Sequence, residues 1–257
     1  MNYSDFKSTI LTQIQHRVGY EKKVQIQEII KNNHVPLDGL SILEAGNNIS
    51  PTIYLNSYFL SFKNGTSIPT ICDEILLLYE KNRSPSPIDL EFFTNFSKIK
   101  DKIVFKLVNL EKNKILLKEI PHIPYLDLAI IFYCLVDAGE RGNITILIRN
   151  QHLKLWNITD KELYDLAAIN TPFLLPDDFN SMTSILESYL ETQSISNELP
   201  GSTYALCPMY VLTNSSKLFG AACILYNGML KKIAETLQSC FYILPSSVHE
   251  GATRFAS

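Results

Sequence analysis

Apolar residues in the first eighty positions follow helical spacing in some segments and form strand-like runs in others. Residues 6–18 carry an apolar residue at every fourth position, which predicts an amphipathic helix. The short apolar runs at 24–30 and 37–43 flank turn-forming residues and predict a β-hairpin. Residues 54–62 and 71–79 return to helical spacing. The first part of the chain is therefore predicted to mix helix and sheet.

The middle of the chain contains runs rich in Ile, Val, Leu and Phe that predict central strands. These runs lie at residues 103–110, 126–136 and 144–148. Two helices are expected after them, at 159–169 and 179–190. The first begins at Thr159, and Glu162 three residues later completes a capping box, in which each side chain accepts from the other's backbone N–H.

The C-terminal sequence predicts a ββαβ unit. Strands are expected at 209–212 and 221–226, followed by a helix at 229–238 with Asn227 as its N-cap, and then a strand at 241–244. Together with the preceding segments, this predicts an α+β fold in which helices are mixed with antiparallel-rich sheets.

Residues 83–87 predict a joint in the chain, because two prolines with small polar neighbours cannot continue a helix. We therefore expect an N-terminal mixed unit at residues 1–84 and a C-terminal α+β unit at 85–257. A single extended domain is the alternative.

Composition and charge argue against several classes of protein. Of the 257 residues, 46% are hydrophobic and 19% are charged, as in folded globular proteins. The 23 Lys and Arg residues against 26 Asp and Glu residues give a net charge of −3, so nucleic acid is not expected as a partner. The longest apolar stretch, residues 128–136, is too short to span a membrane.

The cysteines and the N-terminal residues predict a cytoplasmic protein. The five cysteines are odd in number and lie mostly in apolar runs, as free thiols do in a reducing compartment. Residues 1–10 lack the apolar core of a secretory signal. The ten glycines form no phosphate-binding loop, and the five histidines lack metal-ligand spacing, so neither a cofactor nor a metal ion is expected.

Two groups of residues are candidates for catalysis. One follows the last predicted strand and brings together hydroxyls, an imidazole and a carboxylate, the groups of a nucleophile, its base and an orienting acid. Its members are Ser246, Ser247, His249 and Glu250. The other is His122 with Asp127, in which the imidazole would act as general base. The structural alternative is that Ser246 follows Pro245 in a turn, and that His122 and Asp127 orient a loop.

An aromatic stripe is the candidate for binding a partner. Tyr54, Tyr58, Phe59 and Phe62 recur at helical spacing, so one face of this helix is rich in rings. Such a face is typical of protein interfaces, and core packing is the alternative.

Eight segments of the chain together resemble a bacterial family, domain-of-unknown-function family 5688. They are residues 31–33, 49–56, 121–122, 127–129, 170–172, 209–214, 220–222 and 243–250. A more distant similarity, to the uncharacterised YtpQ-like family, covers residues 128–132, 146–148, Trp156, 162–167 and Asn170 together with the C-terminal unit. The YtpQ-like similarity implies an α+β fold with a repeated mixed unit and no particular reaction or ligand. The resemblance to family 5688 also implies a strand after Glu250, whereas residues 251–257 are not strand-like, which predicts a truncated or frame-altered terminus.

These observations predict a non-enzymatic cytoplasmic module that binds or regulates through a protein or peptide partner. The alternative function is a hydrolase or transferase that uses the Ser, His and Glu residues near the C-terminus.

Overall fold

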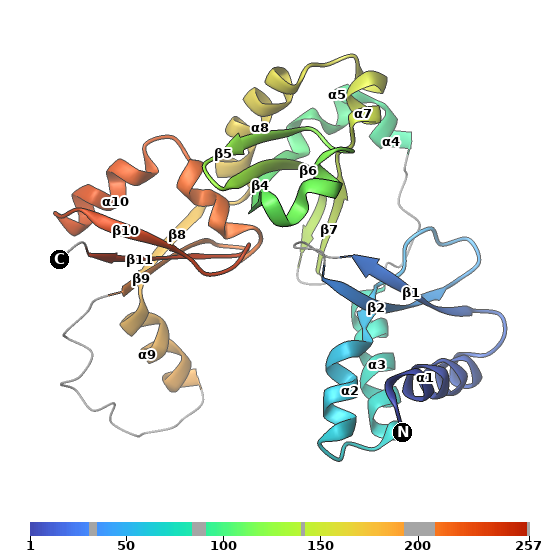
Figure 1. Ribbon diagram of the computed structural model, residues 1–257. Coiled ribbons are helices and arrows are strands. Elements are labelled where there is room, and N and C mark those ends of the chain that lie inside the picture. Colours follow the sequence, from blue (N-terminus) through green and yellow to red (C-terminus); the bar gives the residue numbers. More distant parts are fainter. Residues whose placement is uncertain (31–34, 84–90, 140–141, 193–208, 256–257) are drawn as a thin grey trace. The chain divides into compact units, whose positions relative to one another are not determined.

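The computed structural model describes residues 1–30, 35–83, 91–139, 142–192 and 209–255 (Figure 1). The chain divides into two compact units. Met1–Phe93 with Gly139–Asn143 form the N-terminal unit, and Thr94–Ala138 with Ile144–Ser257 form the C-terminal unit. Most of the predicted joint at 83–87 lies outside the described residues. The α+β fold class is confirmed, because helices accompany three antiparallel sheets in the described part of the chain.

The N-terminal unit packs helices against a three-stranded antiparallel sheet of order β1-β2-β3. Its elements are α1 (Tyr3–Val18), β1 (Lys23–Ile30), β2 (Pro36–Leu43), β3 (Ile53–Tyr54), α2 (Leu55–Lys63) and α3 (Ile68–Asn82). Phe6, Ile10 and Ile14 lie on one face of α1 and are fully buried, so this helix forms one side of the core. The predicted first helix, hairpin and two following helices are confirmed.

Glu44, directly after β2, ties α3 to the sheet. Its carboxylate accepts a hydrogen bond of 2.7 Å from the Tyr79 hydroxyl and forms ion pairs of 2.6 Å with Lys22 and 3.7 Å with Arg83. The hydrogen bonds from Lys22 and Tyr79 hold the pKa of Glu44 below its ordinary value.

The first sheet of the C-terminal unit has the order β4-β6-β5, and β7 pairs with β6. Its elements, preceded by α4 (Glu91–Thr94), are α5 (Phe96–Ile99), η2 (Lys100–Lys102), β4 (Ile103–Asn109), η3 (Glu111–Asn113), α6 (Lys114–Leu117), β5 (His122–Tyr125), β6 (Leu128–Gly139), β7 (Gly142–Leu147), α7 (Asn150–Trp156) and α8 (Asp160–Leu174). The predicted strands and the Thr159–Glu162 capping box are confirmed.

Helix α8 covers the outer strand β4 and supplies hydrogen-bond partners to its backbone. The Thr171 hydroxyl accepts from the Phe105 N–H at 3.1 Å and donates to the Ala167 carbonyl at 2.6 Å. The Asn170 amide donates to the Ile103 carbonyl at 3.1 Å. Side chains of a helix therefore take the place of a further strand at this edge.

The second sheet of the C-terminal unit is antiparallel and has the order β10-β11-β9-β8. Its elements are β8 (Asp177–Ser181), α9 (Met182–Thr192), β9 (Met209–Asn214), η5 (Gly220–Leu225), α10 (Met229–Leu237), β10 (Phe241–Pro245) and β11 (Gly251–Phe255). Helix α10 buries Met229, Ile233 and Leu237, and its Lys232 forms an ion pair of 2.7 Å with Asp177 of β8. We call this layer the C-terminal sheet.

Three predictions for this region are wrong. Residues 179–181 belong to β8, which pairs with β9, and the helix begins only at Met182. The apolar run at 221–226 is a 3₁₀ helix, η5, rather than a strand, because a short apolar run has no periodicity that separates the two. The N-cap of α10 is Gly228, at φ 74°, and not Asn227.

The expectation that residues 251–257 form no strand is also wrong for the described residues. Gly251–Phe255 is β11, and it lies between β10 and β9. Its sequence has weak strand propensity, but backbone hydrogen bonding to a neighbour on both sides overrides that preference. The observed order of elements is therefore strand, 3₁₀ helix, helix, strand, strand, in place of ββαβ.

Candidate functional site

Ser246–Glu250 form the turn between β10 and β11, and their polar groups bond to one another. The Ser246 hydroxyl donates to the Glu250 carboxylate at 3.2 Å. The Ser247 hydroxyl accepts from the His249 N–H at 3.0 Å, and the Ser247 N–H donates to the Glu250 carbonyl at 3.2 Å. These contacts close the turn, and in the described chain no hydrogen bond joins either serine hydroxyl to the imidazole of His249.

His249 anchors this turn to the start of η5. Its Nδ1 accepts from the Phe219 N–H at 3.3 Å, and its ring stacks on the Phe219 ring with centroids 6.1 Å apart. The His249 carbonyl accepts from the Thr213 hydroxyl at 2.8 Å. Because Nδ1 accepts a hydrogen bond from the backbone, this nitrogen holds the turn in place and does not accept a proton from a serine hydroxyl.

Gly220, the first residue of η5, lies where η5 comes very close to His249 and to Thr213 of β9. A Cβ at this position would lie 2.3 Å from both the His249 carbonyl oxygen and the Thr213 hydroxyl oxygen. The Ala221 N–H also donates to the Val248 carbonyl at 3.3 Å. Three of the segments that carry the family resemblance, 209–214, 220–222 and 243–250, therefore meet at one place and hold one another.

His122 and Asp127 are not brought together. His122 opens β5, and its Nδ1 lies 3.1 Å from the Ile120 carbonyl oxygen. Asp127 lies in the turn beyond Tyr125 at the other end of the strand, and its carbonyl accepts from the Leu110 N–H at 3.0 Å. From His122 to Tyr125, three steps along the strand cover about 10 Å. This pair does not form a His–carboxylate dyad.

The aromatic stripe of α2 faces the core of the N-terminal unit. The ring centroids of Phe59 and Phe62 lie 5.3 and 5.6 Å from that of Phe6 on α1. Tyr58 packs against the same core, and burial raises its pKa. Tyr54 is the N-cap residue of α2. The rings of Phe59 and Phe62 are therefore partly buried and packed against the core, which favours the packing alternative, and a partner-binding role for this face stays a prediction.

A buried lysine that contacts Phe219, the ring on which His249 stacks, was not predicted from the sequence. Lys106 of β4 is only 4% exposed, and its ammonium lies 4.3 and 4.6 Å from the ring centroids of Tyr133 and Phe219. Both rings offer their faces to the cation, an arrangement that stabilises a charge removed from water. Its signal in the sequence is a single lysine inside the apolar run 103–110.

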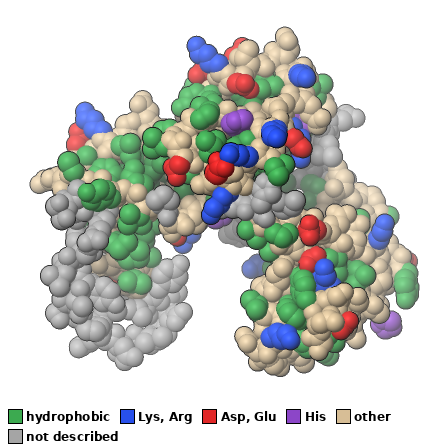
Figure 2. All heavy atoms as spheres, in the orientation of Figure 1, with side chains coloured by type: hydrophobic (Ala, Val, Ile, Leu, Met, Phe, Trp, Pro, Cys, Tyr) green, Lys and Arg blue, Asp and Glu red, His purple; other side chains and the backbone are tan. Residues whose placement is uncertain are grey.

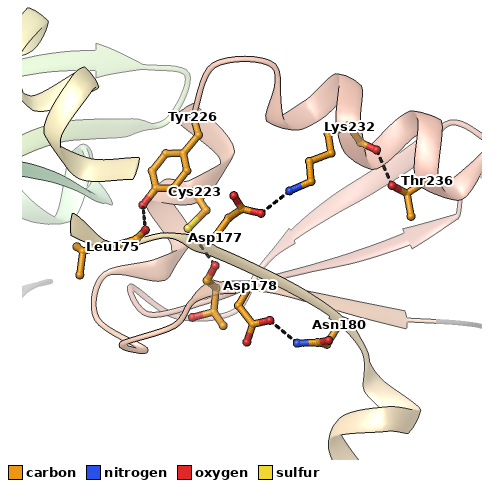
Figure 3. A network of polar contacts seen from close by, with 9 residues as sticks. Leu175, Asp177, Asp178, Asn180, Cys223, Tyr226, Lys232 and Thr236 are labelled. Atoms are coloured by element: carbon orange, nitrogen blue, oxygen red, sulfur yellow. Dashed lines mark hydrogen bonds and ion pairs between the residues drawn. The ribbon is translucent and has the colours of Figure 1, made fainter. Parts of the chain in front are cut away.

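A polar network joins η5 to Leu175 at the end of α8 and to β9, and joins α10 to β8 (Figure 3). The Tyr226 hydroxyl donates to the Leu175 carbonyl at 2.7 Å, and the Cys223 thiol donates to the Thr213 carbonyl at 3.0 Å. Burial raises the pKa of the Cys223 thiol to about 11. This thiol is therefore protonated at neutral pH and acts as a structural donor, not as a nucleophile.

The two outer strands of the C-terminal sheet differ in character. Strand β8 carries Asp177, Asp178 and Asn180, of which Asp177 is paired with α10. Strand β10 has no charged residue, and Tyr242, Ile243 and Leu244 are 60%, 36% and 41% exposed. Figure 2 shows hydrophobic side chains at the surface over α10 and β10. An apolar outer strand of this kind is the most accessible binding feature among the described residues of the sheet.

A shallow hollow of about 650 Å³ adjoins the start of β10. It is lined by Lys231, Ala234, Glu235, Ser239, Cys240 and Phe241. The sequence identified β10 as a strand but gave no sign that it is an outer one, except for Pro245 at its end, a residue that sheets tolerate at their edges.

The chain matches the model of a family of unknown function, DUF5688, over residues 3–251. This chain belongs to that family. No curated protein and no solved structure matches the chain. The similarity to the YtpQ-like family stays an expectation.

Neither a metal-binding cluster nor a membrane-spanning helix is found among the described residues. No group of three or more His, Cys, Asp or Glu side chains there is placed to hold a metal ion. None of the described helices combines the length and apolarity needed to cross a membrane.

Proposed function

We propose that this protein is a non-enzymatic cytoplasmic binding module that takes an extended segment of a partner chain along β10. The observation that carries the proposal is the exposure of three consecutive apolar residues, Tyr242, Ile243 and Leu244, on an outer strand. The outer side of such a strand presents backbone donors and acceptors in a row, and an added strand satisfies them while its side chains contact the exposed apolar residues.

The contacts of the catalytic candidates support a binding role over the enzymatic alternative. The hydroxyls of Ser246 and Ser247 and the Nδ1 of His249 are used to build the turn after β10. That turn is anchored to η5, so it holds the end of β10 in place. A fixed strand binds an extended segment with a smaller loss of conformational entropy than a mobile one.

The cytoplasmic part of the proposal rests on the cysteines. Cys72, Cys134 and Cys223 are buried free thiols, and Cys240 is an exposed one. Burial raises the pKa of the Cys134 thiol to about 11, as for Cys223. Free thiols in such positions are typical of proteins kept in a reducing compartment.

Peptide titration tests the proposal. The probe is a fluorescein-labelled peptide of alternating Val and Thr, about eight residues long, which has the length and pattern of a strand. We expect its fluorescence anisotropy to rise with wild-type protein and not with Ile243→Lys, because a charge on β10 opposes strand addition. The matched control is Asn180→Lys on β8, which should bind as wild type does. Equal binding by all three proteins would exclude β10 as the site.

A further inference from the structure

We propose that the strand which pairs with β10 belongs to a second copy of this chain. The inference rests on the proposed function, because both require β10 to accept a strand. In the dimer, the two copies of β10 lie antiparallel about a two-fold axis and join the two C-terminal sheets into one. The contact is self-complementary, so it closes at two copies.

The first argument is that β10 lacks the charged residues that keep many sheet edges from pairing. Outer strands of natural sheets commonly carry charged residues, above all lysine, or are covered by other elements. Phe241–Pro245 contains no charged residue. At the other edge of the same sheet, β8 carries Asp177 and Asp178. Strand β10 therefore carries no charge that would repel a second strand pairing with it.

The second argument comes from the backbone of β10. Pro245 has no N–H, and an outer strand accommodates proline where its nitrogen points away from the neighbouring strand. Because backbone groups alternate in direction along a strand, those of Ile243 and Phe241 also point away from β11. With the two-fold axis at Ile243, this residue exchanges two hydrogen bonds with its own copy. The Phe241 N–H then donates to the carbonyl of Pro245 of the partner subunit.

The third argument is the match between side chains in this register. Tyr242 lies opposite Leu244 of the partner subunit, and Ile243 lies opposite Ile243 of the partner subunit. Cross-strand pairs of an aromatic with an aliphatic residue stabilise antiparallel strands. Each directly opposed pair within the strands is apolar, so the exposed residues of one copy cover those of the other.

The hollow beside β10 extends this contact. In the same register, Cys240 at the hollow lies opposite Ser246 of the partner subunit. The turn that follows β10 in one copy therefore runs past the hollow of about 650 Å³ in the other. The dimer consequently buries surface beyond the strand edge, which alone is small for a stable interface.

The mass of the particle in solution is the first test. Sedimentation equilibrium should show the wild-type mass rising to twice that of the chain as protein concentration increases. Ile243→Lys should remain at the mass of one chain, and Asn180→Lys should dimerise as wild type does. Far-UV circular dichroism of both variants should match wild type, so that a loss of dimer is not a loss of folding.

Disulfide cross-linking tests the register. In an antiparallel pair, residues directly opposite each other have Cα atoms about 4.5 or 5.5 Å apart, within the range for a disulfide. Ile243→Cys should therefore form a covalent dimer with itself under mild oxidation. Leu244→Cys should not do so alone but should cross-link to Tyr242→Cys in a mixture. Oxidised wild type measures the background from native thiols such as Cys240.

The outcomes separate this inference from the proposed function. A chain that stays monomeric, and in which Ile243→Cys gives no more cross-linking than wild type, overturns the second copy as partner. The peptide titration, performed at dilution, then decides the proposed function independently. A concentration-dependent dimer that Ile243→Lys does not weaken also overturns the inference, because it places the contact elsewhere.

Discussion

Phe59 and Phe62 of α2 lie within 5.6 Å of the Phe6 ring, whereas Tyr242 and Leu244 of β10 remain exposed. Both groups are large and apolar. By hydrophobicity alone, Phe59 and Phe62 would be the better binding surface. The difference arises from what lies next to them. Helix α2 turns its rings onto α1, whereas β10 is the outer strand of its sheet. An apolar surface is available for binding only where the topology leaves it without a neighbour.

The largest expected effect is that of Phe59→Ala on the N-terminal unit. Removing a partly buried ring that contacts Phe6 should destabilise this unit by about 3 kcal/mol, the lower end for phenylalanine to alanine. Urea unfolding followed by circular dichroism measures the loss. The fluorescence of Trp156, the only tryptophan and part of the C-terminal unit, should be unaffected.

Leu60→Ala is the matched control for this variant, since Leu60 lies on the same helix and is 65% exposed. It should change the free energy of unfolding by less than about 0.5 kcal/mol. If Phe59→Ala were no more destabilising than Leu60→Ala, the ring would not be a core residue, and the aromatic face of α2 would again be a candidate surface.

Thr171→Val opens the covered edge at β4 and should have the next largest effect. Valine has nearly the shape of threonine but cannot accept from the buried Phe105 N–H. Leaving this donor unpaired should lower the free energy of unfolding by about 2 kcal/mol. Urea unfolding followed by Trp156 fluorescence is the measurement. Thr236→Val, at an exposed hydroxyl of α10, is the control, and equal losses in both variants would contradict the role of α8 as cover.

Glu44→Gln tests a polar contact within the packed N-terminal unit. Because the folded pKa of Glu44 is lowered, its contribution is present above the ordinary value of about 4.5 and is lost as pH falls through the lower folded value. At pH 7 the free energy of unfolding of the variant should be about 1 kcal/mol lower than that of wild type. The difference from wild type should vanish in acid urea titrations. Glu80→Gln, in an exposed ion pair with Arg83, is the control, and a loss independent of pH would refute the assignment.

Tyr242→Ser should have the smallest effect on stability and a clear one on binding. At a dilution where the chain is monomeric, the free energy of unfolding should change by less than about 0.5 kcal/mol, because the ring is mostly exposed in the single chain. The anisotropy change with the strand peptide should be weaker than for wild type. A stability loss as large as that of Phe59→Ala, measured where the chain is monomeric, would show that another part of the same chain covers β10.

Elements whose signals are local were predictable from the sequence. The α1 helix follows from the spacing of Phe6, Ile10 and Ile14, and the start of α8 follows from Thr159 and Glu162. The errors lie in the C-terminal sheet, where pairing between distant segments decides the outcome. Residues 179–181 and 251–255 become strands because β9 lies between them and pairs with both.

The candidate site was predictable only in part. That Ser246 and Ser247 follow a strand in a turn was one of the two interpretations of the sequence, and the observed contacts are those of a turn. The exposure of Ile243 depends on strand order, which no local pattern encodes. The position of Lys106 between Tyr133 and Phe219 likewise depends on a contact between residues far apart in the chain.

The central position of β11 sets the sequence of events during synthesis. Strands β9 and β10 are synthesised before β11, the strand that lies between them. In the finished sheet β9 and β10 do not pair with each other. Until residues 251–255 emerge, the apolar residues of β10 have no neighbour on either side. A nascent chain at this stage exposes apolar strand residues that chaperones bind, and the emergence of residues 251–255 completes the sheet.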